Sequence, residues 1–268
     1  MLIDETLIRL GSFFTIISLM VALQIWLPRR NNPASLGEKT KRWSANFIMV
    51  FAATLLVRVL LPLSATAFAL LVEERGWALL GFTMWVIPAI ILLDMLIYFQ
   101  HRIFHEVPLL WRLHKLHHSD NWLDVSSAVR FHPVEIFLSM LIKFAAILLF
   151  GVPALAIMWF EVILNGTALF NHSNARIPGD KWLRLFIVTP DMHRVHHSVY
   201  PEETNSNYGF NIPWWDRWFG TYTAQPRDGH KNMKIGINEF PQGETSLKNM
   251  LLMPFVKIKH GVASEKTG

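Results

Sequence analysis

The chain has 268 residues, of which 52% are hydrophobic and only 17% are charged. Together with a positive mean hydropathy of +0.29, this indicates a helical membrane protein rather than a soluble enzyme. The sequence contains no cysteine, which excludes disulfides and thiolate metal sites. The net charge of +5 does not indicate a nucleic-acid partner, because the basic residues lie beside apolar runs, where they would meet anionic lipid headgroups.

Three apolar stretches are long enough to cross a bilayer, at residues 10–27, 43–63 and 76–99. Between the first two, the loop 28–42 carries five basic residues and one acidic residue. The positive-inside rule therefore predicts that this loop is cytoplasmic and that the N-terminus lies outside. Arg58 interrupts the second span, where we expect its side chain to snorkel to the interface. The third span then returns the chain to the cytoplasmic face at His101.

The next apolar run, residues 134–170, is too long for one span, and Gly151-Val152-Pro153 interrupts it as a hairpin turn would. Lys143 lies in its first arm, where we expect snorkelling. The sequence thus predicts an all-α, multi-pass integral membrane protein. It has about three spans, a helical hairpin, and a cytoplasmic histidine-rich cap that holds a di-metal site.

Three histidine clusters carry the main functional signal. Residues three or four apart lie on one face of a helix, so each cluster projects imidazoles to one side. Burying so many imidazoles together is unfavourable unless a metal compensates for their desolvation. With an isolated histidine at 172, the ligand candidates are His101, His105, His114, His117, His118, His172, His193, His196 and His197. Eight or nine ligands exceed what one ion uses, which predicts two ions. Imidazole suits iron, copper and zinc alike.

Four acidic residues near the clusters are candidates for orienting the ligands. Asp94, Tyr98, His101 and His105 form one stripe on a predicted helix. An aspartate within an apolar span is a functional candidate by default, and accepting the outer N–H of a ligating histidine is its simplest role. A helix-packing hydrogen bond is the alternative. Glu106, Asp120 and Asp191 are assigned the same role by proximity to the clusters alone.

The remaining histidines have other predicted places. His132 precedes Pro133 at the start of an apolar run, so we expect a helix cap or a group behind the ligands, although it could itself be a ligand. His230 and His260 lie outside every cluster and are expected at the surface. Pro108 is predicted to separate the helix of the first cluster from that of the second.

Two further segments have the composition of a membrane interface. Residues 177–188 are predicted to form an amphipathic connector, with Lys181 and Arg184 on its polar side and Trp182, Leu185 and Phe186 on its apolar side. Residues 205–222 are rich in Trp and Tyr, which suits a headgroup-level belt. A wall of a lipid tunnel is the alternative reading of this second segment.

The histidine motifs resemble those of the fatty acid hydroxylase/sterol desaturase superfamily. The resemblance rests on Asp94-xxx-Tyr98-xx-His101-Arg102-xx-His105, on Trp111-Arg-Leu-His-Lys-Leu-His-His-Ser119, and on Thr189-Pro-Asp-Met-His-Arg-Val-His-His-Ser198. It covers roughly residues 84–222, and the Trp-Arg-Leu-His box is also similar to the alkylglycerol monooxygenase branch. The resemblance implies two iron ions, O2 as co-substrate and a lipid substrate. It also divides the chain into an N-terminal transmembrane region (1–83), a catalytic region (84–222) and a polar C-terminal tail (223–268).

The predicted reaction is the hydroxylation of an unactivated lipid C–H bond, because a redox metal can perform it and side-chain acids and bases cannot. Desaturation and ether-lipid cleavage use the same site and are the alternatives. Electrons would come from an external donor of the cytochrome b5, ferredoxin or reductase type, since the sequence carries no motif for such a cofactor. A membrane metal-binding or transport protein is the non-enzyme alternative. Against it, the clusters fall on one predicted side of the membrane and outside the spans.

Overall fold

The computed structural model describes residues 2–80, 85–241 and 243–256. In this part of the chain every named secondary-structure element is a helix. The long helices are α1 (Leu2–Trp26), α2 (Leu36–Leu60), α4 (Val86–Glu106), α6 (Pro133–Phe150) and α7 (Ala154–His172). The shorter ones are α3 (Ala65–Arg75), α5 (Pro108–His118), η1 (Val125–Val129), α8 (Asp180–Leu183), α9 (Pro190–His196), α10 (Pro201–Thr204), α11 (Trp214–Trp218), α12 (Gly229–Asn232), α13 (Leu247–Leu252) and η2 (Met253–Phe255).

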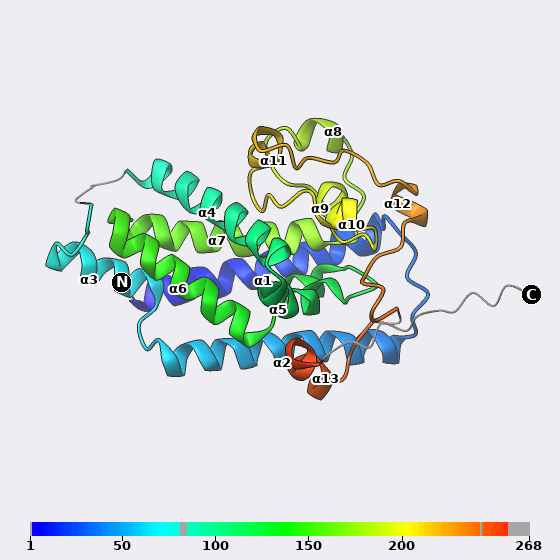
Figure 1. The fold of residues 1–268 in the computed structure, drawn as a ribbon, viewed down its shortest axis with the longest axis horizontal. Helices are drawn as coiled ribbons and strands as arrows, with labels where there is room; N and C mark the ends of the chain where they lie inside the picture. The colour runs from blue at the N-terminus through cyan, green and yellow to red at the C-terminus, as the bar shows by residue number, and fades with distance from the viewer. Residues whose placement is uncertain (1, 81–84, 242, 257–268) are drawn as a thin grey trace, which may run out of the picture.

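The long helices lie side by side along one direction and form a bundle (Figure 1). Among the described residues, five helical segments are long and apolar enough to cross a membrane. One of them, Leu36–Arg75, combines α2 with α3. The 11 residues of α3 are too few to cross a bilayer on their own. The N-terminus of α1 lies at one end of the bundle, whereas α9, α10 and α12 gather at the other (Figure 1).

Small side chains allow the helices to approach closely in the half of the bundle that lies away from α9. The core between α3, α4, α6 and α7 contains Ala65, Ala69, Ala89, Ala146 and Ala156, all buried. Such residues are typical of helix contacts in lipid, where close van der Waals packing replaces the hydrophobic effect as the driving force. Larger side chains then fill the remaining space, as in the stacked rings of Phe68 and Phe144, whose centroids are 4.5 Å apart.

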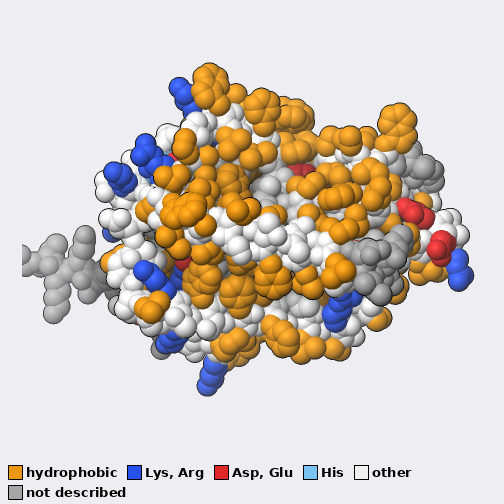
Figure 2. Space-filling view, turned by 180° about the vertical axis from the view of Figure 1, so that it is seen from behind, with side chains coloured by type: hydrophobic (Ala, Val, Ile, Leu, Met, Phe, Trp, Pro, Cys, Tyr) orange, Lys and Arg blue, Asp and Glu red, His pale blue; other side chains and the backbone are white. Residues whose placement is uncertain are grey.

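The outer surface of the bundle is apolar. Hydrophobic side chains cover much of the middle of the face in Figure 2, and most of the Lys and Arg side chains in view lie toward its left end. Phe14, Phe51 and Val59 are 62%, 70% and 70% exposed on α1 and α2. Exposed apolar side chains over such an area are unfavourable in water and favourable in lipid, which supports a membrane location for the bundle.

The hairpin and the helix boundaries at prolines follow the sequence prediction. α6 ends at Phe150 and α7 begins at Ala154, with Gly151 between them at a positive φ of 64° and its N–H bonded to Ile147. A side chain at this left-handed position would be strained, so glycine ends the helix at little cost. α5 begins at Pro108, and α6 begins at Pro133 behind a His132 side chain that caps it by accepting the N–H of Val134.

Three features differ from the predictions. The expected connector helix over 177–188 is reduced to the four residues of α8, and Arg184 is buried, donating to the carbonyl of Ala224. Lys143 does not snorkel, because it forms a salt bridge with the buried Glu161 of α7. The expected third span begins as a helix only at Val86, and its residues 81–84 lie outside the described residues.

The described part of the C-terminal segment packs against the bundle. Met250 and Met253 are buried in a small cluster with Ala45 and Met49 of α2 and Leu116 of α5. The carbonyl of Glu244 accepts a hydrogen bond from the buried Arg130 at 2.6 Å. This segment therefore covers the helix that carries the second histidine cluster.

The bundle predicts which loops share a side of the membrane. Ser35, before α2, and Glu202, in α10, are both exposed at the histidine end, whereas Glu74 is exposed at the end of α3. We expect single cysteines at positions 35 and 202 to react with an impermeant thiol reagent from the same side, and a cysteine at position 74 to react only from the other side. Reaction of positions 35 and 202 from opposite sides would contradict this arrangement.

Candidate metal centre

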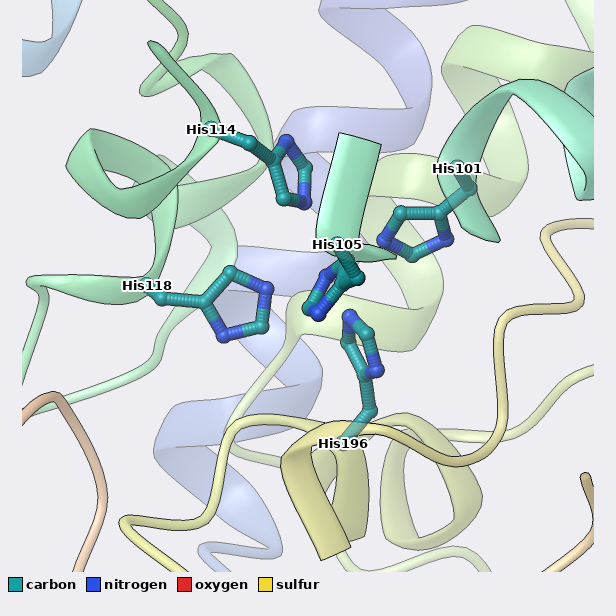
Figure 3. A group of neighbouring side chains, drawn as sticks. All are labelled: His101, His105, His114, His118 and His196. Atoms are coloured by element: carbon teal, nitrogen blue, oxygen red, sulfur yellow. The ribbon is translucent and has the colours of Figure 1, made fainter. Parts of the chain in front are cut away.

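The nine candidate histidines are all buried and form two separate groups. The first group contains His101, His105, His114, His118 and His196, and Figure 3 shows its rings gathered around one space. The second contains His117, His172, His193 and His197. Within each group the potential ligand nitrogens all lie within 4.8 Å of one another. The sequence-predicted ligands are therefore brought together without exception.

Helix geometry explains how the motifs divide between the groups. In α5, His114 and His118 are four residues apart and enter the first group, while His117 points to the second. In α9 the arrangement is reversed: the residues four apart, His193 and His197, enter the second group, and His196 enters the first. The two adjacent histidines at the end of each motif therefore face different groups: His117 and His118 in one motif, and His196 and His197 in the other. Each HxxHH motif bridges both groups, which holds them at a fixed separation.

In the second group, the Nε2 atoms converge. Nε2 of His172 lies 3.0 Å from Nε2 of His117 and 3.0 Å from Nε2 of His193, which is 3.1 Å from that of His197. Nδ1 of His172 lies 2.7 Å from the carbonyl oxygen of Ala168, which can only accept, so Nδ1 carries the proton. The Nε2 lone pair of His172 is then free to face its neighbours, and a shared cation is the favourable partner for such lone pairs.

In the first group, carbonyl and carboxylate oxygens fix the outer nitrogens in the same way. Nδ1 of His101 donates to the carbonyl of Tyr208 at 2.8 Å, and Nδ1 of His196 donates to that of Ser206 at 2.7 Å. Nδ1 of His114 lies 2.6 Å from Oε1 of Glu135. Partners of this kind are typical behind metal-ligating histidines, because they set the tautomer that leaves Nε2 unprotonated.

In the first group, several ring nitrogens have no hydrogen-bond partner among the described residues. These orphan atoms are Nε2 of His105, His114 and His196 and both ring nitrogens of His118. An unsatisfied buried nitrogen costs free energy, and a metal ion would satisfy several at once. Burial also lowers the pKa of His117, His118, His193, His196 and His197 well below the usual range. These five histidines are thus held neutral, as metal binding requires, and the donor set of the two groups fits two ions.

The four predicted carboxylates lie elsewhere. Asp94 contacts no histidine and instead accepts the indole N–H of Trp215 at 2.7 Å and the backbone N–H groups of Asn211 and Ile212. Its connection to the site is indirect, through the segment whose Tyr208 and Ser206 carbonyls hold His101 and His196. Glu106 is half-exposed and pairs with Arg102 on the same turn of helix, away from the histidines.

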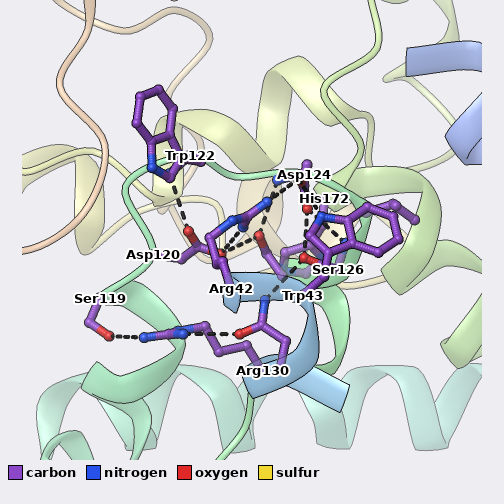
Figure 4. Close-up of polar contacts among 12 residues, drawn as sticks. Arg42, Trp43, Ser119, Asp120, Trp122, Asp124, Ser126, Arg130 and His172 are labelled. Carbon is purple, nitrogen blue, oxygen red and sulfur yellow. Dashed lines mark hydrogen bonds and ion pairs between the residues drawn. The ribbon is translucent and has the colours of Figure 1, made fainter. Parts of the chain in front are cut away.

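Asp120 and Asp191 belong to ion-pair networks that fix the loops around the site. Arg42 of α2 reaches both Asp120 and Asp124, and Arg130 donates to Ser119 in the same loop (Figure 4). Burial alone would raise the pKa of Asp120, but Arg42 and Arg130 outweigh it and leave this pKa below its usual value. Removing one partner of such a buried pair typically costs about 3–5 kcal/mol, so the loop after α5 is firmly anchored.

At the third cluster, Asp191 accepts from Arg29 at 2.9 Å and pairs with Arg194. His230 lies 3.6 Å from Asp191 and its side chain is 3% exposed, so the prediction that His230 is a surface residue is wrong. His260 lies outside the described residues. His132 is the predicted cap, and its Nε2 lies 3.1 Å from the carbonyl of Leu251. It belongs to neither histidine group.

A cavity of about 320 Å³ opens on the histidines and extends into the bundle. His101, His114 and His117 line one part of it. Its walls are largely apolar and come from α2, α4, α6 and α7: Val50, Ile97, Phe104, Ile136, Met140 and Leu164. This volume is at the lower end for ligand sites, so it accommodates one chain or one end of a lipid rather than a whole two-chain molecule.

Sequence reasoning missed Glu135, which is the acidic side chain that contacts a ligand candidate directly. Glu135 stands in the first turn of α6, where an acidic residue is ordinary because it interacts favourably with the helix dipole. Because its position in the first helical turn already explains an acidic residue, the sequence gives no sign that Glu135 also contacts His114. The carbonyls of Tyr208 and Ser206 were also missed, since backbone contacts leave no residue-type signal.

The fold and the site define a class: an apolar bundle of helices long enough to span a membrane, with a buried, all-histidine candidate centre for two metals. The family model described as fatty acid hydroxylase matches residues 85–221, just over half of the chain. The chain belongs to this family.

The names of three similar proteins describe oxidations of lipids. An ornithine lipid hydroxylase from Rhizobium tropici is 32% identical over 150 residues, covering 56% of this chain and 45% of that protein. A human alkylglycerol monooxygenase is 31% identical over 146 residues, 53% of this chain and 32% of that protein. A Delta(7)-sterol 5(6)-desaturase from Gibberella zeae is 27% identical over 155 residues, 57% of this chain and 45% of that protein. The chain spans less than half the length of these relatives, and no solved structure matches it.

Glu135→Leu is expected to weaken metal binding at the first group by about 10–100-fold, because His114 loses the oxygen that orients it. Glu135→Gln retains an oxygen acceptor and should lose less. Chelator competition on the purified protein measures both. Glu106→Leu is the matched control and should leave the affinity unchanged, since Glu106 contacts Arg102 and no histidine. Equal losses in Glu135→Leu and Glu106→Leu would refute the role given to Glu135.

Gly209→Ala should destabilise the segment behind the first group by about 1–3 kcal/mol. A Cβ at this position would lie 2.6 Å from Oδ2 of Asp216 and 3.0 Å from the carbonyl of Ile212. That carboxylate accepts the N–H of Gly209 itself, while Oδ1 accepts the N–H of Tyr208. Thermal unfolding in detergent measures the change. Gly37→Ala, in open space on α2, is the control and should be neutral or slightly stabilising. An unchanged midpoint for Gly209→Ala would contradict this packing.

Proposed function

We propose that this protein is a membrane-bound oxygenase that binds two iron ions and uses O2 to hydroxylate a C–H bond of a lipid. The observation that carries the proposal is the pair of buried imidazole groups at the head of an apolar cavity. Family membership supports the lipid substrate and the oxidative chemistry. The names of the relatives support the same class of reaction.

The residues of the chain have distinct tasks in this reaction. The five and four histidines would each hold one ion, and bound iron would supply the redox chemistry that activates O2 toward a C–H bond. Glu135 and the carbonyls of Tyr208 and Ser206 hold the outer N–H groups and so keep the rings in place. The apolar walls of the cavity position the lipid chain and exclude water, which limits side reactions of activated oxygen.

The basic segment 28–42, which runs from the end of α1 into the first turns of α2, supports a cytoplasmic site by the positive-inside rule. In Figure 1 this segment joins α1 to α2 at the end of the bundle where α9 and α10 lie. An external donor of the cytochrome b5, ferredoxin or reductase type would deliver electrons there, since the sequence of this chain has no motif for a redox cofactor of that kind.

Two other oxidations are compatible with the same centre. The sterol desaturase relative supports desaturation, and the alkylglycerol monooxygenases support attack beside an ether oxygen. Both would use the same histidines and the same cavity. A metal-transport role is less well supported, because both groups lie at one end of the bundle and the cavity beyond them has mainly apolar walls.

Metal analysis of protein purified without oxygen tests the centre. We expect about two iron ions per chain, because the ligands divide into two groups that can each complete a coordination shell. His196→Ala and His117→Ala each remove a ligand from a different group, so each should lower the metal content and abolish oxidation of lipid extracts. His260→Ala, outside the clusters, is the control and should retain both. A metal content of one ion per chain or none in the unsubstituted protein would contradict the two-iron proposal.

A further inference from the structure

The cavity that begins at the histidines reaches charged residues deep in the bundle. Lys143 of α6 and Glu161 of α7 line it together with His114, His117 and Glu135. Lys143 stands eight residues beyond Glu135 on α6, which is about 12 Å along the helix axis. Glu161 stands eleven residues before His172 on α7, which is about 16 Å. One end of the cavity therefore holds the candidate metal ligands, and another part, roughly 12–16 Å away, holds an ion pair.

The ion pair is part of a compact network that joins four helices. Glu161 pairs with Lys143 and with Arg9 of α1. Arg9 also pairs with Glu5 at 2.7 Å and donates to Thr66 of α3 at 3.0 Å. The side chains of Lys143 and Glu161 are only 11% and 12% exposed. The formal charges of the two bases and two acids cancel.

Stability alone does not account for charges at this depth. Replacing a buried ion pair with apolar residues of similar volume is often neutral or stabilising, so a bundle in lipid has no need of one. Ionisable residues inside membrane spans instead tend to mark substrate or ion pathways. Here the pair lines the same cavity as the metal-ligand candidates, which connects it to the substrate rather than to the lipid outside.

The charges and hydrogen-bond donors of Lys143 and Glu161 favour a ligand group that is polar but uncharged. The ammonium of Lys143 has three N–H donors and two contacts among the described residues, Oε1 of Glu161 and the sulfur of Met140 at 3.8 Å. A remaining donor can therefore reach an oxygen in the cavity. An anionic group would leave the otherwise balanced network with a net negative charge, at a high desolvation cost. A plain hydrocarbon end would leave the donor unsatisfied.

We propose that Lys143 and Glu161 form a polar end of the substrate cavity and recognise a hydroxyl or carbonyl oxygen on the inserted end of the lipid. The inference rests on the proposed function and narrows its substrate class. The substrate is an elongated lipid that carries a neutral oxygen roughly 12–16 Å from the carbon presented to the metals. The distance between the two ends of the cavity then selects which carbon is oxidised.

The test compares the binding of two single-chain lipids that differ only at the chain end, one ending in a methyl group and the other in a hydroxyl group. Both are measured by equilibrium competition on the full chain, loaded with metal in detergent. We expect the hydroxylated lipid to bind about tenfold more tightly or better, because a site built to hydrogen-bond an oxygen discriminates strongly against its absence. Equal binding by the unsubstituted protein would overturn the inference without the need for any variant.

A double variant distinguishes recognition of the lipid oxygen from a role of the ion pair in helix packing alone. Lys143→Met with Glu161→Leu removes both charges and leaves Arg9 paired with Glu5, so the preference for the hydroxylated lipid should vanish or reverse. Arg227→Met with Glu202→Leu removes an exposed pair and should retain the preference. A changed unfolding temperature with an unchanged preference would show that the network only clamps helices, and would overturn the inference.

The binding readout does not depend on turnover, so the two proposals fail separately. Preference for the hydroxylated lipid without oxidation of any lipid would refute the proposed function and leave the recognition site standing. Oxidation of both lipids with equal affinity would refute the recognition site and leave the proposed function standing.

Discussion

The convergence of nine buried histidines in two groups is the constraint on which the rest of the structure depends. Each orphan nitrogen costs free energy in the apolar interior, and a shared cation would remove that cost. The rings must also be fixed, because a rotated imidazole would present the wrong nitrogen. Carbonyl and carboxylate oxygens behind the rings of His101, His114, His172 and His196 meet this second requirement for those four side chains. The ion pair of Arg42 with Asp120 and the hydrogen bond from Arg130 to Ser119 then hold the loop that follows the second cluster.

The spacing of the histidines along the helices directs their side chains into the two groups. Histidines four apart share a group, and a histidine three positions along faces the other group, so each HxxHH motif contributes to both groups. His101 and His105 complete the first group, and His172 completes the second. The hairpin of α6 and α7 matters because it returns the chain to the end it left and delivers His172 beside α9. The same hairpin supplies Glu135, Lys143 and Glu161 to the cavity, so the histidine groups and the cavity are built from shared helices.

Spacing along the chain predicted which histidines come together and where the long helices lie, because side chains three or four residues apart share one face of a helix. The stripe of Asp94, Tyr98, His101 and His105 and the break at Gly151 are examples. Proximity along the chain did not reveal the main partners of the carboxylates. Asp120 pairs with Arg42 and Asp191 with Arg29, both from distant segments, and Asp191 also pairs with the nearby Arg194. Glu135 was hidden behind its ordinary place in a first helical turn. His230 was misplaced because its burial depends on Asp191, 39 positions earlier in the chain.

The measurement that tests the central claim most directly is X-ray absorption at the iron edge of protein loaded with iron in the absence of oxygen. Two all-histidine groups predict a first shell dominated by imidazole nitrogen, with the multiple-scattering pattern of imidazole rings and no sulfur. A first shell dominated by carboxylate or water oxygen, with no imidazole pattern, would show that iron binds elsewhere and would contradict the account.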